Sequence, residues 1–387
     1  MPPHLSDTVA LLGELIAFPT ISERSNLDMI AFLANRLEQS GARVKIFQDE
    51  TGQKANLLAT IGPDTDGGIV LSGHSDVVPA AEHDWTTNPF EMTEQGGRLY
   101  GRGACDMKGF IAATVAMAPH FSEIAPNRPI HFAFTYDEEV GCFGARALVD
   151  SLTAGNLKPS VAIIGEPTEM RIIEGHKGCY EYTTHFLGLP GHGSSPDRGV
   201  NAVEYAVRYV GRLMELKDRL RARAPEGSRF DPPWTTINTG RMQGGVAHNV
   251  IASAAELDWE MRPVQQADAD FVKADLQRFC EEELLPAMQA VWAEASITTE
   301  VIGEVDGLEP VEENEAKHIM MELMGANTAD VVAFGTEAGI FQNFGMAAVV
   351  CGPGSIEQAH KADEFVSLDQ LQQCLQMLER LGNRLSA

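Results

Sequence analysis

Short apolar segments alternate with helical patterns in the first half of the chain, and this alternation constrains the fold more than any other feature. The segments IVLSG, IHFAFT and VAIIG are apolar at nearly every position, and helical periodicity at 27–40 and 109–121 is interleaved with them. Strands that are apolar on both faces need covering layers on both faces. The sequence therefore predicts an α/β fold with a mostly parallel, mixed sheet between helices, and functional side chains at the carboxyl ends of its strands.

The middle of the chain has a different pattern. Strands are predicted at 181–187, 235–241, 254–261 and 296–301, and helices at 201–222 and 267–291. The order β-α-β-β-α-β is typical of a compact two-layer unit. An α/β pattern resumes near residue 310 and includes a strand at 347–351. We therefore expect one domain formed by 1–178 and 305–387, with a second domain inserted at 179–304.

Composition excludes several classes of function. The chain has 29 Lys and Arg against 55 Asp and Glu, a formal charge of −26, which argues against electrostatic binding of nucleic acid or of an anionic membrane. Its six cysteines form no CxxC pair, which favours reduced thiols and a cytoplasmic location. The first apolar stretch has no basic segment before it, and no run of eighteen apolar residues occurs, so neither a signal peptide nor a membrane span is expected.

Five short segments at or just after predicted strand ends each carry a side chain that can bind a metal. Taken singly, each has an ordinary interpretation, since an Asp or Glu after a strand is usually a turn or cap residue. Together, two imidazoles and three carboxylates without a thiolate indicate a catalytic site of the zinc or cobalt type. The segments are SGHSD at 72–76, GACDMKG at 103–109, YDEEVG at 136–141, GEPT at 165–168 and QAHK at 358–361.

These motifs, in combination, resemble those of the M20 co-catalytic metallopeptidases and deacylases. The resemblance runs from the first helix to about Phe365. It implies two Zn²⁺ ions, which Co²⁺ can replace, about 3.5–4 Å apart. It assigns His74 and Glu166 to one metal, Glu139 and His360 to the other, and Asp106 to a bridge between them.

The same resemblance implies roles for residues around the metals. Asp76 orients His74, because a carboxylate on the outer nitrogen fixes the imidazole tautomer. Glu138 is the expected general base, since its neighbour Glu139 is used as a ligand. His192, in a Gly-His-Gly turn of the inserted domain, would reach the active site of a partner subunit in a homodimer and stabilise the oxyanion. A cis peptide bond between Asp106 and Met107 is also implied.

Within the family, the chain is similar to the members that hydrolyse N2-acetyl-L-ornithine to L-ornithine and acetate in arginine biosynthesis. The similarity is carried by GEPT at 165–168, GHKG at 175–178, DRGVNA at 197–202, GTEA at 335–338 and GPGSIEQAH at 352–360. Ala338 departs from the Pro expected in some relatives, so close analogues such as N-acetyl-citrulline stay possible substrates.

Such a substrate is a small N-acyl amino acid with an α-carboxylate and a side-chain ammonium. Arg262 is the candidate for the carboxylate, with a surface ion pair as the alternative. Asn249 and Thr336 are further candidate contacts. Glu337 is the candidate for the ammonium, and a helix N-terminal residue favoured by the dipole is an equal interpretation.

Other functions remain open at this point. A desuccinylase for succinyl-diaminopimelate and a dipeptidase are alternatives within the family. A homologue that binds metal without catalysis is less favoured, because the expected ligands and the base are all in place. A doubly wound nucleotide-binding protein is excluded, because no GxGxxG follows the first strand and no Walker loop occurs.

Overall fold

The computed structural model describes residues 3–80 and 84–386, which divide into two compact units. The first unit comprises Met1–Gly175, Pro310–Val331 and Thr336–Ala387, and the second comprises His176–Glu309 and Val332–Gly335. The second unit thus extends a few residues beyond the predicted insert at each end. Each unit has its own apolar core.

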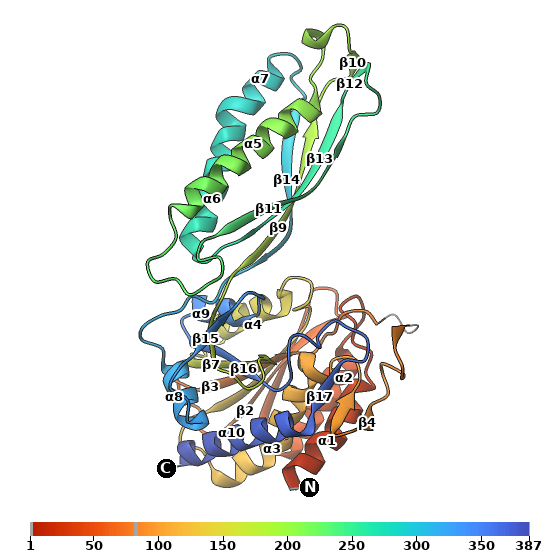
Figure 1. Ribbon diagram of the computed structural model, residues 1–387. Coiled ribbons are helices and arrows are strands. Elements are labelled where there is room, and N and C mark those ends of the chain that lie inside the picture. The colour runs from red at the N-terminus through yellow and green to blue at the C-terminus, as the bar shows by residue number, and fades with distance from the viewer. Residues whose placement is uncertain (1–2, 81–83, 387) are drawn as a thin grey trace. The chain divides into compact units, whose positions relative to one another are not determined.

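The first unit is built on an eight-stranded mixed sheet in the order β1-β2-β6-β3-β7-β16-β8-β15 (Figure 1). Its four central strands, β6, β3, β7 and β16, are parallel, and β1, β2 and β8 pair antiparallel. All residues of β3, β6 and β7 are buried, which is the physical counterpart of their apolar sequences. The strands are β1 (Arg43–Gln48), β2 (Ala55–Ile61), β3 (Ile69–His74), β6 (Ile130–Thr135), β7 (Val161–Pro167), β8 (Ile173–His176), β15 (Asp330–Val332) and β16 (Ala347–Gly352).

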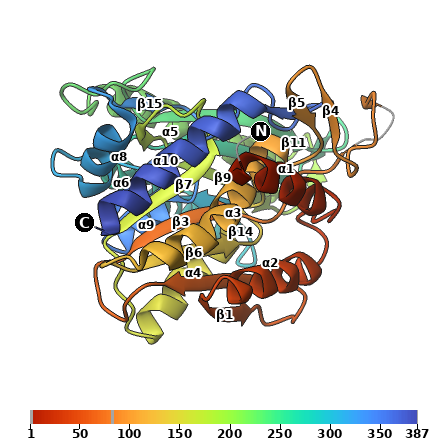
Figure 2. The same cartoon turned by 90° about the horizontal axis from the view of Figure 1, so that it is seen from below.

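Helices cover both faces of this sheet. On one face α1, α3 and α10 lie side by side, with α2 and α8 beside them (Figure 2). On the other face α4 and α9 pack against each other. A small sheet in the order β17-β5-β4, which the sequence analysis missed, completes the unit. These elements are α1 (Pro3–Ile16), α2 (Leu27–Gln39), β4 (Thr93–Gln95), β5 (Arg98–Tyr100), α3 (Gly109–Ile124), α4 (Phe143–Ala154), α8 (Glu315–Met324), α9 (Ala338–Asn343), β17 (Phe365–Ser367) and α10 (Leu368–Ser386).

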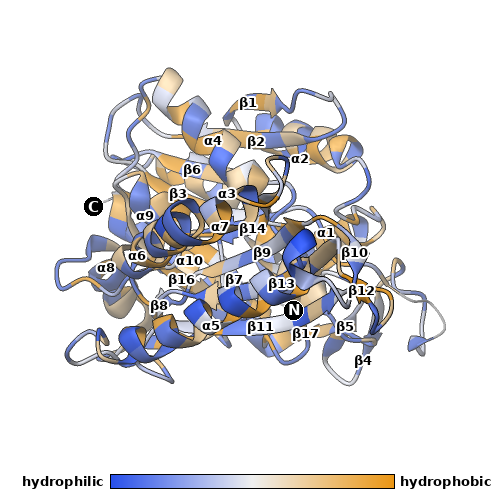
Figure 3. Cartoon of the chain, turned by 90° about the horizontal axis from the view of Figure 1, so that it is seen from above, coloured by the Kyte–Doolittle hydropathy of each residue, from blue (hydrophilic) through white to orange (hydrophobic). Residues whose placement is uncertain are grey.

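The second unit has the predicted β-α-β-β-α-β order. Its antiparallel sheet, β11-β13-β9-β14, buries alternate residues of β9 and β13 against helices α5 and α6. Both helices carry hydrophilic and hydrophobic residues in turn (Figure 3), and α5 buries residues three or four positions apart. The elements are β9 (Cys179–Leu187), β10 (Gly191–His192), α5 (Ala202–Arg221), β11 (Thr236–Gly244), β12 (Val250–Ile251), β13 (Ala254–Arg262), α6 (Gln266–Phe279), α7 (Leu285–Gln289) and β14 (Ser296–Val305).

The helix predicted at 267–291 is interrupted. A π-helical segment, Cys280–Leu284, separates α6 from α7. Pro286 has no N–H to donate to the preceding turn, and the amide of Leu285 bonds to the carbonyl of Cys280, five residues back. The predicted helix is therefore present over 266–289, and the π-helical turn within it is the feature that the sequence did not predict. No helix in the described ranges combines the length and the apolar character needed to cross a bilayer.

Candidate metal centre

The parallel strands β3, β6 and β7 end at the same edge of the large sheet, and each delivers part of the candidate site. His74 is the last residue of β3, Glu138 and Glu139 follow β6, and Glu166 lies near the end of β7. Because β3 pairs with both β6 and β7 in parallel, the carboxyl ends of the three strands are neighbours. The sheet therefore gathers side chains that are far apart in the sequence.

The five predicted metal ligands lie together in the first unit. His74 Nε2 is 2.9 Å from Asp106 Oδ1 and 3.7 Å from Glu166 Oε1. His360 Nε2 is 3.2 Å from Asp106 Oδ2 and 3.0 Å from Glu139 Oε2. The two oxygens of Asp106 thus face the two imidazoles, which is the arrangement expected of a bridging carboxylate between two metal positions.

Asp106 lies in the π-helical segment Ala104–Lys108, which leads into α3. Gly103 precedes it with φ +81°, and a Cβ there would lie 2.7 Å from Val77 Cγ1, so only glycine fits. The peptide bond between Asp106 and Met107 is cis, in agreement with the prediction from the family resemblance. The carboxylate of Asp106 is buried beneath the two histidines.

Asp76 connects the His74 strand to the turn after β6. Its Oδ1 is 3.6 Å from His74 Nδ1 and accepts the backbone N–H of Glu138 at 3.1 Å. Its Oδ2 accepts the backbone N–H of Glu139 at 3.3 Å and the hydroxyl of Ser22 at 2.7 Å. Asp76 therefore orients the imidazole mainly through its backbone carbonyl, which lies 3.0 Å from His74 Nδ1, and its carboxylate fixes the turn that carries the candidate base and a candidate ligand.

Burial and mutual repulsion perturb the acidic groups of the cluster. Burial raises the pKa of Glu166, and the charge of Asp106 raises it further. Hydrogen bonds to Asp106 and Glu139 raise the pKa of His360 to about 10. Burial acts to lower the pKa of His74, but its bonds to Asp106 and Asp76 outweigh burial and hold the pKa well above its usual value. A metal would bind these groups by displacing protons from the imidazoles.

One oxygen of Glu166 is the best evidence that these side chains suit a divalent metal. Glu166 Oε1 is buried and has no hydrogen-bond partner among the described residues. A buried carboxylate oxygen without a donor is costly. Within the described chain, two groups in this unit have their ligand atoms close enough to hold an ion, namely His74 with Glu138 and Glu166, and His74 with Asp106 and Glu139. The site is therefore suited to a cation beside Glu166, with nitrogen and oxygen ligands.

Glu138 has the placement that a proton acceptor needs. Burial raises the pKa of its carboxyl well above the ordinary value, while the charge of His74 opposes that rise. The thiol of Cys142 lies 3.6 Å from Glu138 Oε1. The carboxylate of Glu138 is close to His74 and Glu166, beside the candidate ligands of the cluster.

His192 and Asn249 belong to the second unit and lie next to each other. The two-stranded ribbon of β10 and β12 pairs His192 with Val250, and the N–H of Gly193 donates to the carbonyl of Asn249 at 2.8 Å. The N–H of Ser194 donates to His192 Nδ1 at 3.2 Å. The hydroxyl of Ser194 lies 2.7 Å from the same nitrogen. The imidazole is exposed, so its Nε2 edge is available to another molecule.

Arg262 ends β13 in the second unit and forms an ion pair with Glu260. Its Nη2 and Nε lie 2.8 and 3.1 Å from Glu260 Oε2. The alternative interpretation of Arg262 as an ion-pair residue therefore describes the structure as it stands. Glu260, Cys179 and Glu181 also bring their ligand atoms together, but Arg262 already compensates the charge of Glu260, so this second cluster is a weaker candidate for a cation.

Thr336 and Glu337 are buried at the start of α9 in the first unit. The hydroxyl of Thr336 accepts the N–H of Ala338 at 3.0 Å. The carboxylate of Glu337 accepts the hydroxyl of Ser72 at 2.9 Å and the hydroxyl of Thr135. Glu337 has no exposed surface, so an ammonium group could reach it only if these bonds were exchanged. The structure therefore places Glu337 in a buried hydrogen-bond network at the N-terminus of α9.

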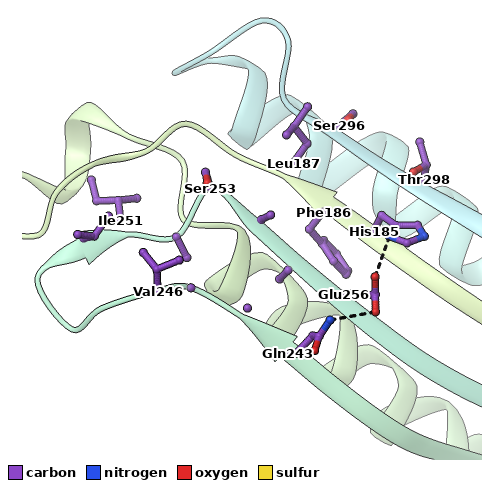
Figure 4. Close-up of a pocket in the computed structure, with 16 residues that line it drawn as sticks. His185, Phe186, Leu187, Gln243, Val246, Ile251, Ser253, Glu256, Ser296 and Thr298 are labelled. Carbon is purple, nitrogen blue, oxygen red and sulfur yellow. Dashed lines mark hydrogen bonds and ion pairs between the residues drawn. The ribbon is translucent and has the colours of Figure 1, made fainter.

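A hollow of about 510 Å³ lies on the second unit, and its lining includes Val250, the strand partner of His192, but no predicted site residue (Figure 4). It is lined by parts of β9, β11, β12, β13 and β14. Its carboxylate, Glu256, lies 3.3 Å from the amide of Gln243 and 3.5 Å from the imidazole of His185. The polar groups of this hollow are therefore already paired, and we do not assign the reaction to it.

Sequence reasoning missed two residues that support the cluster. Ser22 donates to Asp76, and Glu364 accepts the N–H of Asp106 at 3.2 Å. Glu364 could have been noticed only from its position four residues after His360. Nothing in the sequence around Ser22 points to Asp76, which is 54 residues away.

Comparison with known proteins decides the family. The model of a family described as Peptidase family M20/M25/M40 matches residues 70–384. The chain belongs to this family. The metal-capable cluster and this membership together support a metal-dependent hydrolase.

The relatives extend over nearly the whole chain. The acetylornithine deacetylase of Pasteurella multocida (strain Pm70) is 34% identical over 378 residues, 96% of either chain. That of Proteus mirabilis (strain HI4320) is 37% identical over 368 residues, 93% of this chain and 92% of the relative. Among solved structures, aminopeptidase PepT from Bacillus cereus ATCC 10987 shares the fold, with a TM-score of 0.74 at 17% identity over 99% of both chains. The α/β fold predicted from sequence is confirmed.

Proposed function

We propose that this M20 protein hydrolyses N2-acetyl-L-ornithine to L-ornithine and acetate, a step of arginine biosynthesis, with two Zn²⁺ ions that Co²⁺ can replace. The observation that carries the proposal is the buried cluster in which Asp106 faces two imidazoles and Glu166 has an oxygen without a partner. The acetyl-ornithine substrate is supported by relatives at 34–37% identity that are named acetylornithine deacetylases. A cytoplasmic location fits the free cysteines.

The residues divide the chemistry among them. His74, Asp106, Glu139, Glu166 and His360 would hold the metals. When bound, the metals would acidify a water molecule and polarise the amide carbonyl. Glu138 takes the proton of the attacking water on its carboxylate and passes it to the leaving nitrogen, which departs as the amine of ornithine. Asp76 keeps Glu138 in place through the backbone N–H of that residue.

Recognition of the substrate is proposed for residues of both units. Arg262 would bind the α-carboxylate by exchanging Glu260 for it, since a guanidinium binds carboxylates bidentately. Asn249 would act beside His192, to which its backbone is adjacent. Thr336 and Glu337 are proposed on the ammonium side, where Glu337 would have to exchange the hydroxyls of Ser72 and Thr135 for the ligand.

A panel of substrates tests the proposal. Metal-free protein is reloaded with Zn²⁺ or Co²⁺, and amine release is measured from N2-acetyl-ornithine, N-acetyl-citrulline, N-succinyl-diaminopimelate and a dipeptide. We expect N2-acetyl-ornithine to have the highest kcat/KM and metal-free protein to be inactive. If the protein prefers another compound of the panel, the proposed substrate is wrong. If it hydrolyses none of them, the alternative of a metal-binding protein without catalysis is favoured.

The base is tested in the same assay with Glu138→Gln. The amide of Gln cannot accept the proton of water, so we expect turnover to fall by about 10²–10⁴-fold while both metals stay bound. Asp137→Asn is the matched control, because Asp137 is the neighbouring acid, pairs with Lys54 at 2.5 Å and has a left-handed φ of 53° that Asn tolerates. Substantial activity in Glu138→Gln would show that Glu138 is not the base.

The homodimer is tested by mixing two inactive variants. We propose that His192 acts from the inserted domain on the partner's site, so removal of this oxyanion donor should cost about 10²–10³ in kcat. When Glu138→Gln and His192→Ala subunits exchange, both defects fall on one site of the mixed dimer and the other site is intact. Activity should return. Mixed dimers without activity would show that His192 does not act in trans.

A further inference from the structure

Glu364 is a buried carboxylate that the proposed reaction does not use. Only 1% of its surface is exposed, yet it receives four N–H donors. Its Oε2 accepts from Arg102 Nη1 at 2.7 Å and from the backbone of Gly103 at 3.0 Å. Its Oε1 accepts from the backbone of Cys105 at 3.0 Å and of Asp106 at 3.2 Å. Each oxygen is thus saturated by two donors.

All four donors come from the segment that carries the bridging Asp106. Glu364 itself lies four residues after His360 on a different segment. The bond between Glu364 and the N–H of Asp106 therefore joins two ligand-bearing segments, although its partners are 258 residues apart in the sequence. On the far side of this junction, Asp106 Oδ2 and His360 Nε2 are 3.2 Å apart.

The ladder between β5 and β17 brings the two segments together, but it ends at Tyr100 and Phe365 and includes neither Asp106 nor His360. His74 and Glu166 lie on β3 and β7, and the hydrogen bonds of the parallel sheet hold these strands in register. Asp106 has non-helical backbone angles within its short segment, and His360 lies in a turn with φ +62°. Beyond the ladder, the position of Asp106 relative to His360 thus depends on the backbone bond from Gly101 to the carbonyl of Glu364, at 3.0 Å, and on the bonds that the Glu364 carboxylate accepts.

Arg102 makes the burial of Glu364 possible. Its guanidinium is the charged partner of the carboxylate, and it also donates to the carbonyls of Lys361 and Pro79, each at 3.3 Å. It lies 5.2 Å from the centre of the Trp85 ring. A buried carboxylate that is both ion-paired and fully hydrogen-bonded holds its neighbours rigidly.

We propose that Glu364 is a positioning residue that fixes Asp106 against His360 and thereby sets the affinity of the second metal position. This inference rests on the proposed two-metal function. The other ligands of the first position, His74 and Glu166, are held by β3 and β7, whereas Glu364 lies on the segment of His360, so loss of Glu364 should affect the two positions unequally. The effect should appear in metal binding itself, before any turnover is measured.

The test is a titration of the metal-free full chain with Co²⁺, followed by calorimetry and by the visible absorption of the bound ion. In Glu364→Gln the NH₂ group must face two N–H donors whichever way the amide is turned. We expect the second equivalent of Co²⁺ to bind about 10–100-fold more weakly than in the wild type, with an altered absorption band, and the first equivalent to change less.

Asp363→Asn is the matched control. It removes the same charge one residue earlier, its left-handed φ of 56° suits Asn, and its hydrogen bonds are to Thr86. It should bind both equivalents as the wild type does. Glu364→Gln leaves the buried charge of Arg102 unpaired and could fail to fold for that reason. In that case the double variant Arg102→Gln, Glu364→Gln removes the charge of Arg102 as well, and the same titration is measured.

The outcomes separate this inference from the proposed function. If the wild type binds two equivalents of Co²⁺ and Glu364→Gln binds each of them as tightly as the wild type does, the positioning role is wrong and the two-metal function stands. Equal weakening of both equivalents would also overturn the assignment to the second position. If the wild type binds fewer than two equivalents, the two-metal function is wrong and the inference falls with it.

Discussion

His131 makes the stability of the first unit depend on pH in a way that can be calculated. The imidazole is on β6, 1% exposed, with Nδ1 2.9 Å from the hydroxyl of Thr60 and Nε2 buried without a partner. A Cβ at Gly68 would lie 2.2 Å from that Nε2, so only glycine at this position leaves room for the ring. Burial, and then the charge of Arg43, lower the pKa of His131 to about 4.

The sign follows from proton binding. Between pH 6.5 and pH 4 the unfolded chain carries a proton on His131 that the folded chain does not carry, so stability falls as the pH falls through this window and the loss is complete below pH 4. With 6.5 for the unfolded chain, the linkage relation gives a loss of about 2 kcal/mol between pH 7 and pH 5.

Urea unfolding of metal-free protein, followed by circular dichroism at pH 7, 6 and 5, measures this loss. His131→Leu removes the titrating group, so its stability should fall by about 2 kcal/mol less than that of the wild type over the same range. Thr60→Val removes the hydroxyl partner and keeps the imidazole, so it should lose stability at each pH and retain the wild-type pH dependence. If His131→Leu and the wild type showed equal pH dependence, His131 would not be buried in its neutral form.

Three further predictions concern the first unit. Asp76→Asn should weaken metal binding about 10–100-fold in calorimetric titration, because both oxygens of Asp76 accept backbone N–H groups and the amide must turn its NH₂ toward one of them; wild-type affinity would contradict this. Gly165→Ala should cost about 1–3 kcal/mol or more in urea unfolding, since its Cβ would lie 1.9 Å from Phe110 Cγ; a neutral effect would mean that the ring moves freely. Asn314→Ala should cost about 1–2 kcal/mol, because Asn314 caps α8 by accepting the N–H of Lys317 at 3.0 Å; unchanged stability would show that the cap contributes nothing.

Much of the local structure could be predicted from the order of residues. Uninterrupted apolar segments identified β3, β6 and β7, and the predicted segment 130–135 coincides with β6. Periodicity suffices here because it records which faces of an element are buried. It did not show the π-helical turn before Pro286, and it missed β10, β12 and the small sheet of β4, β5 and β17, which are only two or three residues long.

Part of the candidate site could also be predicted from the sequence. The sequence alone placed His74, Glu139 and Glu166 at strand ends, and the parallel pairing of β3 with β6 and β7 then makes them neighbours. Family resemblance added the division of the ligands between two metal positions, which spacing could not supply.

Tertiary structure alone decided which polar groups support the site. Glu364 meets the N–H of Asp106 across 258 residues, and Glu337 meets the hydroxyl of Ser72 across 265. A periodic pattern shows that a side chain is buried but not which donor it meets, since that depends on how distant segments pack. For the same reason the sequence did not show that Glu337 is enclosed, with its carboxylate accepting hydroxyls from β3 and β6.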